Sequence, residues 1–258
     1  MRRILYAAAA AIALMAGQAA AQTLTIGTKL ELNTLDPHFF NGFPQASSHS
    51  QIFDALTWQN DTQELEPALA ESWRLIDNNT WEFRLRRGVV FHDGSPFTAD
   101  DVIATYARLP NVPNSPALFT VFTRAIAAID KVDDHTIRIR TASPNPLLPL
   151  DLSRVFIISA KDAGQGTSDF NAGKVNGTGW YRVGEWVNAD RLVLRRFDRH
   201  WRGPATWEQV TERVITRDPS RVAALLAGEV DAIDAVPITD KAAIGRDARF
   251  RLFSGPAA

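Results

Sequence analysis

A strict alternation of apolar and charged residues near position 80 limits what this chain can fold into. The stretch reads Trp81-Glu82-Phe83-Arg84-Leu85-Arg86. Because successive side chains of a strand point to opposite faces, the pattern predicts a strand with a buried apolar face and a charged, solvent-exposed face. Arg87-Gly88 then predicts a turn and residues 89–91 a returning strand, so we expect a β-hairpin over residues 81–91.

Strand and helix patterns alternate along the rest of the chain. Strands are expected at residues 24–28, 126–132, 136–140, 155–158, 180–187, 191–197, 210–216, 230–233 and 249–253, a helix within 45–56, and a hairpin or loop over 58–69. Together with the two helices described next, this alternation indicates a mixed α/β lobe that carries an inserted antiparallel subdomain.

Two helices have clear start signals. Thr98 is a favourable N-cap for the first of them. Its expected buried stripe comprises Val102, Ile103, Tyr106 and Leu109. The second helix is expected to begin with Asp218 as N-cap and Pro219 as its first residue, and to end before Gly228.

The first twenty-one residues have the three regions of a secretory signal peptide. Arg2 and Arg3 give a positively charged start, residues 4–16 are an uncharged apolar run, and residues 19–21 supply small side chains for cleavage. The apolar run is too short to span about 30 Å of hydrocarbon. We therefore expect cleavage after Ala21 and export of the mature chain to a periplasm.

The composition excludes several classes of protein. The 28 Lys and Arg residues are balanced by 29 Asp and Glu, so no excess of positive charge is available to neutralise phosphates, and we expect no nucleic-acid partner. Without cysteine, the chain has no disulfide, thiolate metal site or thiol nucleophile. The histidines lack metal-binding spacing and no phosphate-binding or dinucleotide-binding glycine motif is present, so we expect neither a metal nor a cofactor.

His92-Asp93 is the one pair of residues that suggests catalysis. It lies in an Asp93-Gly94 turn, where Asp most often bonds to its own backbone. No Gly-x-Ser-x-Gly motif accompanies it. The sequence therefore predicts an exported α/β protein that is not an enzyme, with a secreted hydrolase acting through His92-Asp93 as the alternative.

Several ordered blocks of sequence belong to one known pattern. They are Thr34-Leu35-Asp36-Pro37-His38, Ala70-Glu71-Ser72-Trp73, residues 81–102, Asn176-Gly177-Thr178-Gly179 and residues 221–231. Together they resemble bacterial solute-binding protein family 5, the extracytoplasmic receptors of peptide, nickel and related ABC importers. The resemblance covers residues 24–258. Directly after the fourth block, Trp180 takes a place where that family commonly has proline.

The resemblance implies a fold of two lobes that close on a solute held between them. We therefore expect an α/β fold: the first lobe of a periplasmic binding protein of type II, peptide-binder class, with an inserted antiparallel β-rich subdomain. The expected divisions are 1–21 signal peptide, 22–45 start of lobe I, 46–165 inserted subdomain and 166–258 remainder of lobe I. Family members are considerably longer, so we expect the second lobe to be missing from the sequence up to Ala258.

The resemblance also implies which residues face a solute. Glu31 matches a family position that can face the amino end of a bound peptide. The expected ligand-binding residues are Glu31, Leu32, Asn33, Thr34, Leu35, Asp36, Gly177, Thr178, Gly179 and Trp180. From the residues alone, Glu31 is equally explained as a solvated loop residue, whereas Asp36 is better explained as a turn former and Trp180 as a packed core residue.

The implied function is that of the substrate-binding component of an ABC importer. Such a protein is a monomer that binds a peptide or other small solute, above all an oligopeptide, by closing about a hinge. It then delivers the solute to an inner-membrane ABC permease. The alternative that chain length leaves open is a truncated fragment that binds no ligand.

Overall fold

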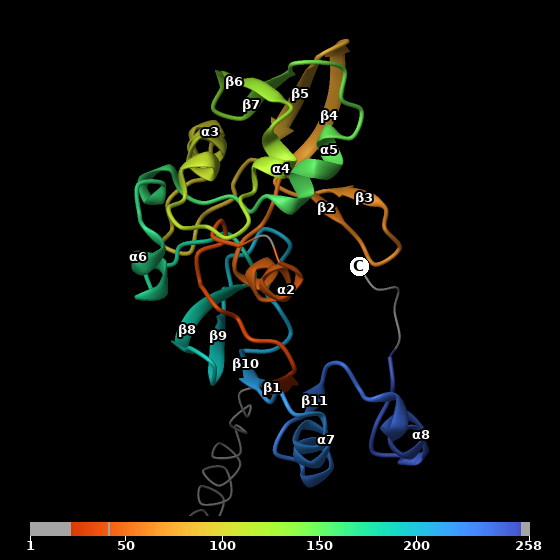
Figure 1. The fold of residues 1–258 in the computed structure, drawn as a ribbon. Coiled ribbons are helices and arrows are strands. Elements are labelled where there is room, and N and C mark those ends of the chain that lie inside the picture. The colour runs from red at the N-terminus through yellow and green to blue at the C-terminus, as the bar shows by residue number, and fades with distance from the viewer. Residues whose placement is uncertain (1–21, 41, 254–258) are drawn as a thin grey trace, which may run out of the picture.

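The computed structural model describes residues 22–40 and 42–253. The predicted signal peptide, residues 1–21, lies outside the described residues. Within the described ranges no helix is both long enough and apolar enough to cross a membrane. Two larger β-sheets, each with its own hydrophobic core, organise this part of the chain (Figure 1).

The first sheet has five strands in the order β11-β1-β10-β9-β8. The strands are β1 (Thr23–Thr28), β8 (Tyr181–Val187), β9 (Arg191–Arg196), β10 (Gln209–Val214) and β11 (Ala232–Ile233). β1 runs parallel to both of its neighbours, β10 and β11, whereas β10, β9 and β8 are antiparallel. The strands predicted at these positions, including the hairpin of β8 and β9, are confirmed.

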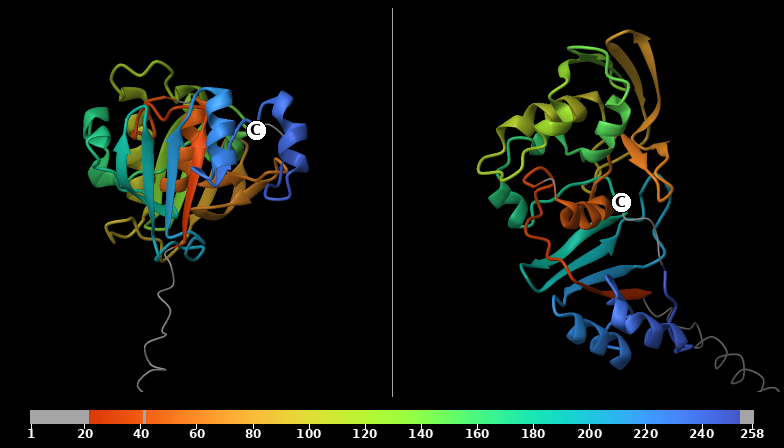
Figure 2. Two further views of the ribbon diagram at one scale, coloured as in Figure 1. Left: turned by 90° about the horizontal axis from the view of Figure 1, so that it is seen from below. Right: turned by 45° about the vertical axis from the view of Figure 1, so that its right-hand side comes forward.

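Helices lie on both sides of this sheet, as the right-hand view of Figure 2 shows. They are α2 (Phe43–Ile52) on one side, and α7 (Asp218–Ala227) and α8 (Ile238–Arg246) on the other. α7 ends before Gly228, as predicted, and the φ of 74° at Gly228 is the left-handed conformation that glycine adopts most readily. Asp218 is the first residue of α7, so the N-cap is Arg217 and the prediction of Asp218 was wrong.

The segment after β11 also differs from the prediction. α8 was not predicted, and residues 249–253 form no strand. Ile244 of α8 packs instead with α7 in a small cluster that includes Ile233 of β11. Ile244 is the one buried residue of α8, so the sequence of α8 has no repeating apolar pattern that would indicate a helix.

The second sheet is antiparallel and has the strand order β4-β5-β7-β6. Its strands are β4 (Ala70–Asp77), β5 (Thr80–Leu85), β6 (Ile126–Asp133) and β7 (Thr136–Thr141). All four lie between β1 and β8 in the sequence, so an antiparallel β-rich part is inserted in an α/β unit, as predicted. The bounds 46–165 stay a prediction. They cut α2 (Phe43–Ile52), and its Ile52 packs in the core of the five-stranded sheet.

The alternating stretch forms β5, but the predicted hairpin over residues 81–91 is wrong. β5 pairs with β4 on one side and β7 on the other, and residues 89–91 do not pair with it. Phe83 and Leu85 are buried as predicted. Trp81 is partly exposed and donates its Nε1–H to the carbonyl of Asn145.

Glu82 lies in a row of three charged residues across this sheet. The register places it opposite Arg74 on β4 and Arg138 on β7. Arg74 Nη2 donates to its carboxylate at 2.6 Å, and Arg138 Nη2 donates at 3.0 Å. Glu82 is therefore 6% exposed instead of solvent-facing as predicted, because two guanidinium groups cover it.

α3 (Ala99–Arg108) has Thr98 as its N-cap, as predicted. The Asp101 carboxylate accepts the Thr98 backbone N–H at 2.7 Å, which is half of a capping box. Of the predicted buried stripe, Ile103 alone is only half-buried. The remaining elements are β2 (Thr57–Gln59), β3 (Leu65–Pro67), η1 (Leu109–Asn111), α4 (Thr120–Thr123), α5 (Leu148–Asp151), η2 (Leu152–Arg154), η3 (Ala160–Asp162) and α6 (Thr167–Asn171). β2 and β3 form a hairpin within the region predicted as hairpin or loop.

Residues 155–158 are buried but do not form the predicted strand. Phe156 makes a single bridge to Ala55, so no ladder of hydrogen bonds develops. Val155 and Ile157 pack in the core of the four-stranded sheet, whereas Phe156 and Ile158 pack in the core of the five-stranded sheet. The extended segment thus joins the two cores.

Candidate functional site

The first loop, residues 29–36, leaves the carboxyl end of β1 beside the parallel strands β10 and β11. In open α/β sheets, ligands bind outside the carboxyl ends of parallel strands. The buried residues of this loop are Leu32, Thr34, Leu35 and Asp36. Asn33 is exposed and Glu31 is half-buried. Among the six predicted ligand-binding residues of this loop, the accessible side chains are therefore those of Glu31 and Asn33.

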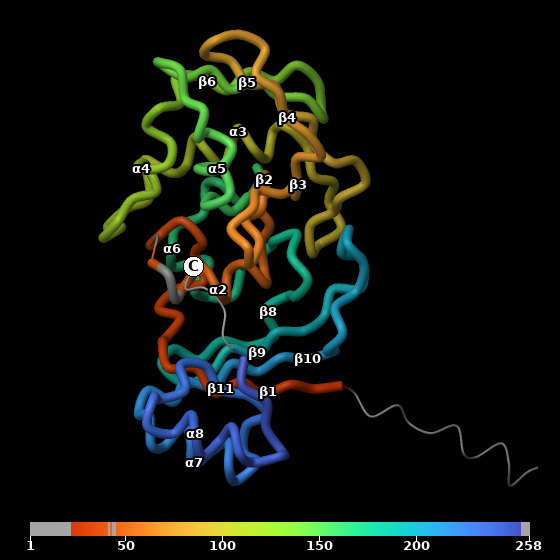
Figure 3. The backbone as a smooth tube through the Cα atoms, turned by 90° about the vertical axis from the view of Figure 1, so that its right-hand side faces the viewer, coloured from red at the N-terminus to blue at the C-terminus, as the bar shows by residue number. Residues whose placement is uncertain are grey.

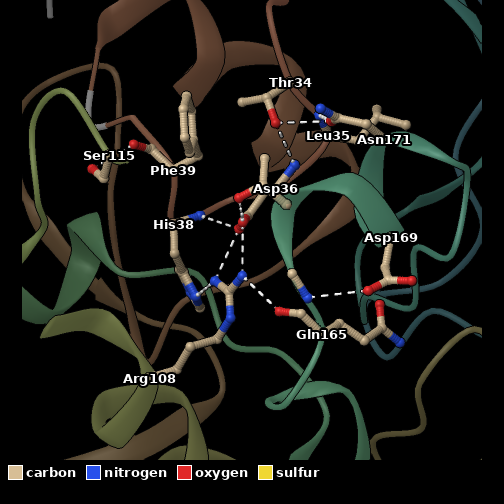
Figure 4. Close-up of polar contacts among 12 residues, drawn as sticks. Thr34, Leu35, Asp36, His38, Phe39, Arg108, Ser115, Gln165, Asp169 and Asn171 are labelled. Atoms are coloured by element: carbon tan, nitrogen blue, oxygen red, sulfur yellow. Dashed lines mark hydrogen bonds and ion pairs between the residues drawn. The ribbon is translucent and has the colours of Figure 1, made fainter. Parts of the chain in front are cut away.

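Asp36 anchors the first loop to α3 through a buried ion pair (Figure 4). Arg108 donates from Nη1 to Oδ1 at 2.9 Å and from Nη2 to Oδ2 at 2.7 Å. The Thr167 hydroxyl donates to Oδ2 at 2.7 Å, and the His38 backbone N–H donates to Oδ1 at 3.0 Å. The Asp36 side chain is 0% exposed and that of Arg108 is 5% exposed, so the ion pair is shielded from water.

Arg108 also sets the protonation of its neighbours. Burial alone would raise the pKa of Asp36, but the hydrogen bonds and charge of Arg108 outweigh it and hold that pKa below its usual range. Burial, together with the same positive charge, lowers the pKa of His38 to about 4. Neutral His38 then accepts from Arg108 Nη1 at Nδ1 and donates from Nε2 to the Phe156 carbonyl.

The middle of the first loop is tied to α6 and α2. Asn171 Oδ1 accepts the Thr34 hydroxyl and the Leu35 backbone N–H, each at 2.9 Å. His49 of α2 donates from Nε2 to the Thr34 carbonyl at 3.0 Å. These contacts fix the loop backbone directly after the accessible Asn33.

His49 should make folding stability depend on pH. Burial lowers its pKa to about 4, against about 6.5 in an unfolded chain. Between these two pKa values, His49 is protonated in the unfolded chain but neutral in the folded one. The folded chain therefore loses stability as the pH falls through this range. Between about pH 7.5 and pH 5.5, the wild-type chain should lose about 1 kcal/mol more stability than His49→Gln, which retains a donor but does not titrate. Urea melts at both pH values measure this; parallel losses would contradict it.

The second predicted motif, Asn176–Gly179, is buried against the end of α2. Gly179 N–H donates to the Ile52 carbonyl at 2.9 Å. His92 donates its backbone N–H to the Gly177 carbonyl at 2.8 Å, and its Nε2 bonds to the Gly179 carbonyl at 3.0 Å. The buried residues of the motif are Gly177, Thr178 and Gly179. In this structure all three serve contacts within the protein.

The same contacts occupy His92. Its Nδ1 accepts the Gly177 N–H at 3.3 Å while Nε2 bonds to backbone on the other side. Asp93 accepts the Ser95 N–H at 2.9 Å, as predicted for a turn, and pairs with Lys161. Neither side chain offers a free group for proton transfer, so the geometry gives the hydrolase alternative no support.

Trp180 packs in a stack of aromatic and cationic side chains. Its ring centroid lies 4.5 Å from that of His200, and the Arg202 guanidinium lies 5.8 Å from the Trp180 centroid. Trp201 continues the stack at 5.4 Å from His200. Trp180 is half-buried, so part of its surface remains accessible.

A pocket of about 630 Å³ is lined by residues of α2, the β2–β3 hairpin, α4 and η2. Figure 3 labels the backbone of α2, α4, β2 and β3. Its aromatic wall consists of Phe40, Trp58, Phe119, Phe122 and Phe156. The polar lining includes Ser47, Ser50, Gln59, Asn60, Gln63 and Ser153, with Asp61 and Arg154 as charged residues. Apolar walls with a few polar groups are typical of sites that bind small molecules. We call this the aromatic pocket.

None of the ten predicted ligand-binding residues lines the aromatic pocket. Its aromatic residues come from separate segments that share no motif, so sequence reasoning missed them. The one available signal was Trp58, a large aromatic residue next to the acidic stretch 61–66. The first loop and the pocket are nevertheless connected, because His38 contacts both Phe156 and the ring of Phe119.

This α/β fold, with its inserted antiparallel sheet, is that of the periplasmic binding proteins, as a solved structure shows. The Escherichia coli murein tripeptide binding protein MppA superposes with a TM-score of 0.80 at 24% identity, over 90% of this chain and 49% of that one. The chain belongs to the bacterial extracellular solute-binding proteins, family 5, whose middle-region model matches residues 64–258.

Curated relatives agree with this family. The periplasmic oligopeptide-binding protein OppA of Escherichia coli is 28% identical over 89% of this chain and 48% of its own length. The probable ABC transporter periplasmic-binding protein SapA of Escherichia coli is 30% identical over 88% of this chain and 46% of its own length. The chain thus spans about half the length of the curated relatives it matches.

Proposed function

We propose that this chain is part of the substrate-binding component of an ABC importer and forms one wall of its solute site. The observation that carries this proposal is the aromatic pocket beside the anchored first loop. Membership of the family and the names of the relatives support an oligopeptide as the solute and a periplasmic location. The importer's inner-membrane permease would receive the solute, and the binding component would act as a monomer.

The ten residues expected to bind the solute divide into two groups by accessibility. Glu31, Asn33 and Trp180 have accessible side-chain surface, and we propose that they contact the solute directly. The buried residues are Leu32, Thr34, Leu35, Asp36, Gly177, Thr178 and Gly179. Their contribution is to hold the two loops in place, because their polar groups already bond to α2, α3, α6 and residue 92.

One wall of a cleft should bind weakly. Drug-sized ligands typically bury ~70–90% of their surface in a pocket, and a single wall supplies only part of that contact. A loss of about 4 kcal/mol weakens binding about a thousandfold, which moves a micromolar site into the millimolar range. We therefore expect this chain by itself to bind peptides at millimolar concentration.

Peptide binding should be visible at Trp58. We expect the Trp58 indole N–H signal to shift saturably in two-dimensional NMR when a tetrapeptide such as Ala-Phe-Leu-Ala is added at millimolar concentration, because Trp58 lines the aromatic pocket. Trp207 is the matched control, since it is similarly exposed but does not line the pocket. Single Trp→Phe variants assign the two signals. Equal shifts of both signals, or no shift of Trp58, would contradict the proposal.

A further inference from the structure

The aromatic pocket contains two charged side chains, Asp61 and Arg154. Both are exposed, and neither forms an ion pair within residues 22–40 and 42–253. His49 also lines the pocket, but burial lowers its pKa to about 4 and it is neutral at neutral pH. The charge that a bound solute meets in this pocket is therefore set by Asp61 and Arg154.

Arg154 is held in position by its neighbour. Its Nη2 donates to Gln59 Oε1 at 2.8 Å, and Gln59 Nε2 in turn donates to the Gln63 carbonyl at 3.3 Å. The hairpin amide thus orients the guanidinium at the pocket wall, while its other N–H groups make no hydrogen bond to the residues that the structure describes. A guanidinium with free N–H groups matches the geometry of a carboxylate, which it can bind through two parallel hydrogen bonds.

Asp61 is placed differently. It lies in the turn between β2 and β3, and in the described part of the chain nothing orients its carboxylate. Its charge disfavours an anion nearby, but an unrestrained exposed carboxylate contributes little because water screens it. The oriented Arg154 therefore has more influence on a solute in the pocket than Asp61.

We propose that Arg154 binds a carboxylate of the solute, while the aromatic wall of the pocket covers an apolar or aromatic group joined to that carboxylate. Phe156 lies two residues after Arg154 and lines the same pocket, so the charged and apolar contacts come from one segment. This inference rests on the proposed function and assigns a ligand chemistry to its pocket.

The test compares two probes that differ in one charge. N-acetyl-L-phenylalanine and N-acetyl-L-phenylalanine amide are titrated into the full chain, and binding is followed at the Trp58 indole signal. The acid should bind about five-fold more tightly than the amide, the upper range for an exposed ion pair. Arg154→Gln should abolish that difference, whereas Asp61→Asn should enlarge it.

Arg84→Gln is the matched control, because Arg84 is exposed on β5 and does not line the pocket. It should leave the acid-to-amide ratio unchanged. Equal binding of acid and amide, or an unchanged ratio in Arg154→Gln, would overturn the inference. If the tetrapeptide shifts Trp58 and neither phenylalanine probe does, the Arg154 inference fails and the proposed function stands. If no probe shifts Trp58, both fail.

Discussion

Replacing Gly177 with alanine should destabilise the folded chain by about 3 kcal/mol or more, because overpacking and a lost hydrogen bond act together. A Cβ at this position would lie 1.9 Å from the Ile52 carbonyl oxygen and 2.9 Å from the Phe53 ring. The oxygen belongs to the end of α2 and already accepts the Gly179 N–H. It cannot move away without breaking that bond. Urea melts followed by tryptophan fluorescence measure the effect.

Gly164→Ala is the control for this substitution. A Cβ at Gly164 would meet nothing within 4 Å. The change should therefore stay within about 0.5 kcal/mol of wild type, as for an ordinary surface site. Similar losses in the two variants would show that the close approach of Gly177 to α2 is not what requires glycine there.

Local patterns predicted the elements well because their signals lie within a few residues. The alternation at residues 81–86 specifies a strand, and Thr98 with Asp101 specifies the start of α3. The strands that pair with β5 could not be predicted in the same way. β4 has an irregular pattern with exposed Leu75 and Ile76, so nothing in its sequence identifies it as the neighbour of β5.

The burial of charged side chains could not be predicted from the sequence. Glu82 was predicted to face solvent because it stands on the charged side of an alternating strand. Its burial depends on Arg74 and Arg138, which reach it only through the register of two other strands. The burial of Asp36 likewise depends on a distant partner, because Arg108 is 72 residues away in the sequence. Ion pairs between residues far apart in the sequence are set by the tertiary fold, so they leave no signal in the local sequence.

The candidate site was predictable only in part for the same reason. The sequence blocks 34–38 and 176–179, which belong to the resemblance to the family, overlap the two candidate loops. Seven of the ten candidate residues in these loops are buried. The aromatic pocket is assembled from residues as far apart as Phe40 and Phe156. No single segment contributes enough of the wall to be recognised in the sequence.

Removing one partner of the buried ion pair should be costly. Arg108→Met leaves the Asp36 carboxylate buried without its counter-charge, and we expect a loss of about 3–5 kcal/mol, the range for breaking a buried pair. The surface pair of Arg140 and Asp130 is the control, because both of its side chains are about half exposed. Arg140→Met should therefore cost about 1 kcal/mol or less.

The pH dependence of the free energy of unfolding tests whether the unpaired Asp36 charge causes the loss of stability in Arg108→Met. In the wild type Arg108 holds the pKa of Asp36 below its usual range, so this contribution to stability is present above the unfolded pKa of about 3.8 and is lost as the pH falls below it. Without Arg108, burial raises the pKa of Asp36, and His38 can take up a proton beside the carboxylate more easily. In Arg108→Met, acidification therefore neutralises the unpaired Asp36 carboxylate, either by protonating it or by protonating His38 beside it.

The deficit of Arg108→Met relative to wild type should therefore narrow as the pH falls from about 7 to 4.5. A double variant, Asp36→Leu with Arg108→Met, removes both charges and should be less destabilised than the sum of the two single variants, because no unpaired charge remains in the interior. Urea melts of the four proteins across this pH range measure both effects. A constant deficit, together with strictly additive single losses, would mean that the packing of the Arg108 side chain, and not its charge, holds the first loop against α3.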